Sequence, residues 1–356
     1  LHGPAFRRRA ESLRSTPSFP HGPRSESRMR SACQELPAHA SHLPGLHAFS
    51  AAPPHGAAAL TPEPMMDMEL SQNFLRAKSP CAAGFRWFVR NRHDGNDYQR
   101  VLDALVGDGR VEDARWLMNQ FGPTDAVLEV DHLEADALVF AGSVVVHGEL
   151  RVPGLLAVGR TLQAGAGLHA GRIEAGQDLH SGGAIFCSGP LQAGGLVKAA
   201  WSVDVHEELR AEDVRAGWEL RCGADLRLAG GAQAGQDIEV QGAIRCGKGL
   251  RAGGSIRASG LIELGHGLYA GADVEGGSHI EVDWGMRALG DIRAACSIRA
   301  GETLHAEGEI AAGPGYGIYA GMNVQQDAWP SCAWVHAAQR PPALLSGWWE
   351  EAAAPA

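Results

Sequence analysis

Residues 238–261 read IEVQGA IRCGKG LRAGGS IRASGL, four hexads that each begin with an aliphatic residue. Two positions later stands a small residue, and a charged residue lies between the two. Side chains on a strand alternate between its two sides, so both apolar residues of a hexad face inward and the charged one faces outward. The stretch therefore predicts very short strands, each followed by a turn.

The same pattern extends from Leu150 to Val324. All 30 first positions are Leu, Ile, Val, Met or Ala, and 26 of the 29 steps between them are six residues long. The exceptions are two five-residue steps, ending at Ile173 and Val214, and one eight-residue step ending at Ile318. Three hexads close a triangular turn, and successive turns pair in parallel. The prediction is a mainly β protein, a single-stranded β-helix (β-solenoid) of about ten turns and roughly 45 to 50 Å.

The rest of the chain divides around this repeat. Residues 1–64, rich in Pro, His, Ser and Arg, are expected to be disordered and outside the natural protein. Residues 65–124 show helical spacing and predict a small domain of three helices. We expect a strand transition or cap at 125–149, the hexad β-helix at 150–326, and a Trp-, Pro- and Ala-rich tail at 327–356 that caps the last turn.

The outward residues test this winding, because residues about 18 apart should be neighbours on one face. One series is Asp204, Arg221, Glu239, Arg257, Glu275 and Arg293, and its charge alternates at every turn. The others are Arg210, Arg227, Arg245, Glu263, Glu281 and Arg299, and Lys198, Arg215, Gln233, Arg251, Tyr269, Arg287 and His305. The run Arg210, Arg227 and Arg245 is the candidate basic patch for a partner, with a solvated face as the alternative.

Three tryptophans are further candidates for contact with a partner. Trp201 and Trp218 share a corner position on consecutive turns, and Trp284 occupies the same hexad position on another face. Exposed Trp is enriched in interface hot spots. The alternative is that these rings cover the corners or pack under the N-terminal helices.

The composition limits the other functions. The formal net charge of the 356 residues is -10, so nucleic acid is not an expected partner unless basic residues cluster, and no apolar run is long enough to span a bilayer. Cys187, Cys222 and Cys246 occupy inward small positions, which predicts core thiols and neither disulfides, metal nor cofactor.

An enzyme is the weakest hypothesis. A hexapeptide acyltransferase needs a His between subunits, and the candidates would be His169, His180, His206, His266, His279 and His305. Such enzymes place the small residue four positions after the aliphatic one, whereas here it comes two after. We therefore predict no catalytic residues and no enzyme activity.

Hexads such as Asp237-Ile238-Glu239-Val240 and Ser255-Ile256-Arg257-Ala258 resemble those of the polymer-forming bactofilins and of the β-helical domain of flagellar assembly A-type proteins. The resemblance covers about residues 135–326. It implies a bacterial, cytoplasmic, cytoskeletal scaffold that polymerises end to end without nucleotide. Our leading hypothesis is accordingly a non-enzymatic cytoplasmic scaffold that self-associates. The alternatives are a capped β-solenoid that binds a protein partner and the acyltransferase.

Overall fold

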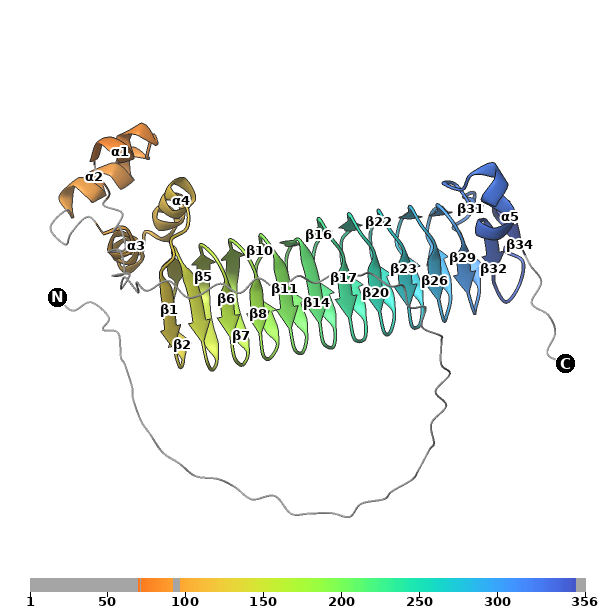
Figure 1. Cartoon of the computed structure of the whole chain (residues 1–356), viewed down its shortest axis with the longest axis horizontal. Coiled ribbons are helices and arrows are strands. Elements are labelled where there is room, and N and C mark those ends of the chain that lie inside the picture. The colour runs from red at the N-terminus through yellow and green to blue at the C-terminus, as the bar shows by residue number, and fades with distance from the viewer. Residues whose placement is uncertain (1–69, 71, 92–96, 350–356) are drawn as a thin grey trace, which may run out of the picture. The chain divides into compact units, whose positions relative to one another are not determined.

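The computed structural model describes residue 70 and residues 72–91 and 97–349, so the expectation for residues 1–64 lies outside the described residues. The predicted fold is confirmed for this part of the chain. It is a parallel β-solenoid of about 12 turns with four helices near its N-terminal end (Figure 1). Each turn contributes one strand to each of three faces, which we call A, B and C in chain order.

The strands are as follows. Face A is β1 (Val127–Val130), β4 (Ser143–Val146), β6 (Leu162–Ala164), β8 (Leu179–Ser181), β11 (Leu196–Ala199), β14 (Asp213–Ala216), β17 (Ala232–Ala234), β20 (Leu250–Ala252), β23 (Leu268–Ala270), β26 (Met286–Ala288), β29 (Leu304–Ala306), β32 (Trp334–His336) and β34 (Trp348–Trp349). Face B is β2 (Leu133–Glu134), the first parts of β5 (Leu150–Val158) and β7 (Leu168–Ala175), β9 (Ile185–Cys187), β12 (Val203–Val205), β15 (Leu220–Cys222), β18 (Ile238–Val240), β21 (Ile256–Ala258), β24 (Val274–Gly276), β27 (Ile292–Ala294) and β30 (Ile310–Ala311). Face C is β3 (Leu138–Phe140), the second parts of β5 and β7, β10 (Leu191–Ala193), β13 (Leu209–Ala211), β16 (Leu226–Leu228), β19 (Ile244–Cys246), β22 (Ile262–Leu264), β25 (Ile280–Val282), β28 (Ile298–Ala300), β31 (Ile318–Tyr319) and β33 (Leu344–Ser346).

The register confirms the winding read from the hexads. The five-residue steps are single sides of a turn, because Ile173 pairs with Leu156 and Val214 with Val197. Asp204 to Arg293 form one outward row on face B, Arg210 to Arg299 on face C, and Lys198 to His305 on face A. The inward aliphatic residues of these strands are buried and stack on one another in a single core.

The Gly and Asp residues of the hexads lie at the corners, where each meets a structural requirement. A Cβ atom on Gly253 would lie 2.1 Å from the carbonyl oxygen of Gly235 one turn before, so the turns stack too closely there for a side chain. Six corner aspartates each accept a hydrogen bond, at 2.6 to 2.9 Å, from a backbone N–H 18 residues later. They are Asp178, Asp213, Asp225, Asp237, Asp273 and Asp291. These bonds satisfy corner donors that would otherwise be unpaired.

The solenoid extends beyond both ends of the hexad run. Residues 127–146, assigned above to a transition or cap, already pair in parallel with the turns that follow. At the other end the prediction that Val324 begins a strand is wrong, because Val335 pairs with Leu304 instead. A 3-10 helix, η2 (Gln326–Ala328), and α5 (Trp329–Cys332) lie between the two positions. The tail then supplies β32, β33 and β34 and so builds the last turn.

Four helices, and not the expected three, precede the strands: α1 (Gln72–Ala77), α2 (Ala82–Arg90), α3 (Tyr98–Gly107) and α4 (Val111–Phe121). The three predicted runs correspond to α2, α3 and α4. The six residues of α1 are too few to show helical periodicity. The helices share a core with the outward-facing Val139 and Ala157 of face C, and Arg115 pairs with Glu174 at 2.7 Å.

Gln99 of α3 covers the outer edge of β3. Its Nε2 donates to the carbonyl of Val139 at 3.0 Å, and its Oε1 accepts from the N–H of Ala141 at 2.9 Å. The side-chain amide thus forms the two bonds that a further strand would form. Unpaired strand edges invite association with other chains, so this contact protects face C at the N-terminal end.

Candidate functional site

The arginines singled out from the sequence lie on consecutive turns of face C. Arg210 pairs in register with Arg227, and Arg227 with Arg245. The next two outward residues are Glu263 and Glu281. From Arg210 to Glu281, face C therefore groups three basic residues and then two acidic ones before Arg299 follows, whereas the charges of face B alternate at every turn.

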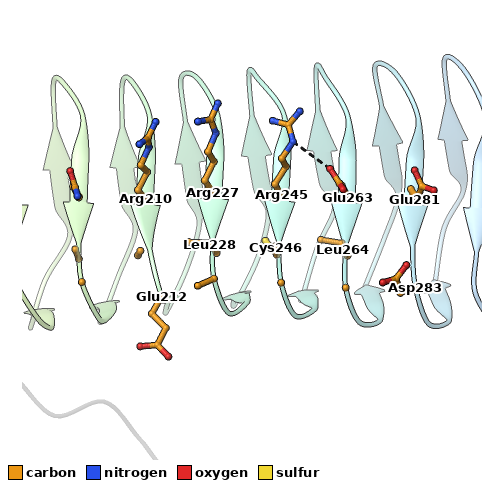
Figure 2. Close-up of a pocket in the computed structure, with 17 residues that line it drawn as sticks. Arg210, Glu212, Arg227, Leu228, Arg245, Cys246, Glu263, Leu264, Glu281 and Asp283 are labelled. Atoms are coloured by element: carbon orange, nitrogen blue, oxygen red, sulfur yellow. Dashed lines mark ion pairs between the residues drawn. The ribbon is translucent and has the colours of Figure 1, made fainter.

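This row borders a groove of about 990 Å³. Figure 2 shows the three Arg side chains rising from successive strands, with Glu263 and Glu281 beyond them. The lining of the groove includes Leu228, Cys246 and Leu264, whose side chains are buried in the solenoid core beneath it. An open groove lined by charged outward side chains is suited to binding a macromolecule and would not enclose a small molecule.

Acidic residues at the corner between faces B and C hold the guanidinium groups in place. Glu208 pairs with Arg210 at 2.8 Å and with Arg227 at 3.2 Å. Asp225 pairs with Arg227 at 2.8 Å and lies 3.9 Å from Arg245, which reaches Glu263 at 3.4 Å. The N–H of Ala243, and then Arg227, hold the pKa of Asp225 below its usual range, so it stays ionised at neutral pH.

Glu208 and Asp225 were missed in the sequence analysis. Each stands directly before the aliphatic residue of a hexad, two residues before an outward Arg. That spacing brings a corner carboxylate beside the guanidinium group, and it was a readable signal. Because each carboxylate contacts two guanidinium groups, the row is held by a shared network of charges.

The three tryptophans do not lie on this row. Trp201 and Trp218 are 65% and 51% exposed at the corner between faces A and B, where the N–H of Trp218 donates to the carbonyl of Trp201 at 3.1 Å. Trp284 is 52% exposed at the corner between faces C and A, and its ring stacks on His266 at 4.4 Å. The six predicted contact residues thus lie on one face and at the two borders of another.

The histidines of the enzyme hypothesis are dispersed over the described solenoid. His169 and His206 contact Phe186 on face B, and His279 bonds to Ser297 at 2.7 Å. His180 and His305 are outward on face A. In the residues that the structure describes, no three His, Cys, Asp or Glu side chains are grouped to hold a metal ion.

The cysteines lie where the hexads predicted. Cys187, Cys222 and Cys246 are buried in the solenoid core. Burial raises the pKa of Cys187 to about 11 and that of Cys246 to about 12. These thiols are therefore protonated and poorly nucleophilic at neutral pH.

Residues 66–121, a range that includes α1 to α4, match the family model of the YdhT N-terminal domain. Neither the curated proteins nor the solved structures give a match to the chain. No helix among the described residues has the length and apolar character needed to cross a membrane.

Proposed function

We propose that this protein is a non-enzymatic scaffold in the cytoplasm, and that copies of it associate side by side through face C. The observation that carries the proposal is the separation of charge along the groove. Like charges opposite each other on neighbouring strands are unfavourable, and face C retains two adjacent Arg pairs and one adjacent Glu pair. A partner with the complementary order would relieve this repulsion.

A second copy has that order. Consider a two-fold axis between two copies of face C, parallel to the strands and midway between β19 and β22. It places Arg245 opposite Glu263 of the second copy, and Arg227 opposite Glu281 of the second copy. Arg210 falls opposite Arg299 of the second copy, so the complementary stretch is limited to the four turns from Arg227 to Glu281. Two-fold symmetry then repeats both contacts, as in most homodimers.

The spacing of the charges also favours a second solenoid. Neighbouring outward residues on face C are separated by one strand spacing, about 4.8 Å. Alternate side chains of an extended peptide are roughly 6.7 Å apart, and those of successive helical turns are roughly 5.4 Å apart. A partner built of stacked strands, such as a second solenoid, keeps its charges in step with the row over several turns.

The cytoplasmic assignment rests on the thiols and on the resemblance. All six cysteines in the described residues are free, which is typical of a reducing compartment. The scaffold role is the one implied by the resemblance of the hexads to bactofilins.

A second candidate is end-to-end assembly, and the first turn of the solenoid favours it. Val127 is 60% exposed, and the inward Leu128, Val130 and Leu133 are only partly buried. Gln99 covers the edge of β3, whereas β1 and β2 each pair on one side only within the described residues. An end-to-end contact would therefore form through faces A and B.

Sedimentation velocity of the full chain over a range of concentrations tests the main proposal. We expect a dimer that dissociates in the all-basic variant E263R/E281R and in the acidic variant R227E/R245E. Mixing the two variants should restore a dimer, because their charges are complementary. The matched control is E239R/E275R on face B, which should still dimerise.

A wild-type monomer at every concentration would contradict the proposal, as would two variants that fail to complement each other. Negative-stain microscopy separates the candidates. Side-by-side pairs support face C, and filaments that persist in E263R/E281R support the end-to-end contact instead.

A further inference from the structure

Face A carries cations that have no acidic partner. Its outward row contains Lys198, Arg215, Arg251 and Arg287, with no Asp or Glu between Lys198 and His305. Within the described residues none of these four forms an ion pair. By contrast, every outward Arg in the rows of faces B and C described above lies within 4.0 Å of a carboxylate.

Among the described residues no ion pair balances the cations in the middle of the face, although Asp237 and Asp273 stand at its border with face B. The corner residues Gly249, Gly267, Gly253 and Gly271 border Arg251 and Tyr269 without side chains. Lys248 adds a further cation, and the Arg251 guanidinium lies 5.1 Å from the centre of the Tyr269 ring. A shallow hollow of about 320 Å³ lies between Arg215 and Arg251 and is lined by Gln233, Lys248 and Asp213, whose carboxylate accepts from the N–H of Gly231 and forms no ion pair within the described residues.

His305 lies at the end of the row, and its pKa depends mainly on its burial. Burial, followed by the neighbouring His336 and Arg287, lowers the pKa of His305. The carboxylate of Glu307 acts in the opposite direction and raises this pKa.

Exposed tryptophans border the row on both sides. Trp201 and Trp218 stand at the corner with face B, beside Lys198 and Arg215. On the other side, at the corner with face C, Trp284 stacks on His266 near Arg287. Trp and Arg are the residues most enriched in binding hot spots, and here they share one surface of a protein whose net charge is negative.

We infer that face A binds an acidic segment of a protein partner, whose carboxylates pair with Arg215, Arg251 and Arg287 and whose apolar side chains pack on Trp201 and Trp218. This surface is separate from face C, so the inference goes beyond the proposed self-association. A scaffold needs such a second surface in order to hold another protein.

The distribution of charge favours a protein segment over nucleic acid. From Lys198 to Arg287 the row spans five strand spacings, roughly 24 Å. Acidic corner residues stand along the border with face B, among them Glu219, Asp237, Asp273 and Asp291. These would repel a long phosphate backbone, which needs a broad basic surface. A short acidic segment fits within the basic strip.

Fluorescence anisotropy of the full chain with labelled oligoglutamate tests the inference. The face A variant R215Q/R251Q/R287Q should bind about tenfold more weakly than the wild type, a loss of about 1.4 kcal/mol. W201A/W218A should weaken binding of a labelled peptide that mixes Glu with Leu more than binding of oligoglutamate. The matched control is R210Q/R227Q/R245Q, which removes the same charge from face C and should bind like the wild type.

Several results would overturn the inference. Equal weakening by the two triple variants would show that only net charge matters. Tighter binding of an oligothymidylate of equal charge would identify a nucleic acid surface, and no binding of either probe would remove the site. All substituted side chains are outward-facing, and circular dichroism verifies that each variant folds. The readout is independent of dimerisation, so a monomeric wild type that still binds oligoglutamate through face A would contradict only the proposed function.

Discussion

Faces A and C are built from hexads of the same pattern on the same turns, yet in the part of the chain that the structure describes the outward arginines of face C form ion pairs with carboxylates and those of face A do not. On face C, Arg227 lies within 3.2 Å of both Glu208 and Asp225. On face A, Arg215 has no carboxylate within ion-pair distance among the described residues. The inward positions are alike on both faces, so the core does not require this difference. This difference indicates that the inward residues and the corners determine the stability of the solenoid. The outward residue of each strand is free to determine what the surface binds.

The largest decrease in the free energy of unfolding is expected when a charged side chain is placed in the solenoid core. Leu250 is buried between Ala232 and Leu268 on face A, so L250D should lower the free energy of unfolding by about 3 to 5 kcal/mol. The outward neighbour offers the control, because R251D should change it by less than about 1 kcal/mol. Urea denaturation followed by circular dichroism measures both. Similar losses in the two variants would contradict the separation of roles.

A smaller effect is expected at the corners. Asp237 accepts a bond from the N–H of Ser255 at 2.6 Å, and Ser255 is buried. D237A should lower the free energy of unfolding by about 1 to 2 kcal/mol, because that donor is left unpaired. Q233A, on the outward surface of face A, should be nearly neutral in the same denaturation experiment. If D237A were equally neutral, the corner bonds would not hold the turns together.

The outward arginines of faces A and C should differ in their contribution to stability. R227Q removes contacts with two carboxylates and should lower the free energy of unfolding by about 0.5 to 1 kcal/mol. R215Q, which removes the same charge from face A, should change it by less than about 0.5 kcal/mol. The difference should shrink in high salt, which screens exposed charges. An equal decrease in the free energy of unfolding of R215Q would show that Arg215 makes a stabilising contact within the folded chain.

The smallest effect concerns His305. Its pKa is lowered in the folded protein, so the unfolded chain binds more protons, and the free energy of unfolding decreases as pH falls through about 6.5 towards the folded value. Replacing Arg287 by Gln removes one of the causes and should raise the pKa of His305, as followed by NMR titration. R293Q on face B is the control. An unchanged titration in R287Q would show that Arg287 does not contribute to the positive field at His305.

Much of the fold could be predicted from the sequence, because an aliphatic residue recurs every six positions. Even the first turns carried a signal, since Leu128, Leu133, Leu138 and Val144 continue the inward row. It was missed because two successive steps are five residues long. Val324 was assigned wrongly because it fits the spacing, and nothing local shows that η2 and α5 delay the next strand until Trp334.

The contacts that decide the surfaces were less readable. The bond between Gln99 and β3 joins residues 40 apart and depends on how a helix docks, which no local pattern encodes. The charge rows were predicted correctly. Many of their ion pairs could not be predicted from the rows, because the carboxylates involved stand at the corners, directly before the aliphatic residue of a hexad. The cations of face A were not predicted to form a basic surface, because Gln233 and Tyr269 interrupt the row. On face C three Arg stand on consecutive turns, which is a clearer pattern.

The corner aspartates have a consequence for how such a chain can lengthen. Because each bonds a residue 18 positions later, a duplicated turn brings its own corner bonds and its own share of the core. The charges of face B, however, recur only every second turn. Gene duplication that adds one turn would place like charges side by side on that face, while duplication of two turns would preserve the alternation. The smallest insertion that leaves face B undisturbed is therefore a pair of turns.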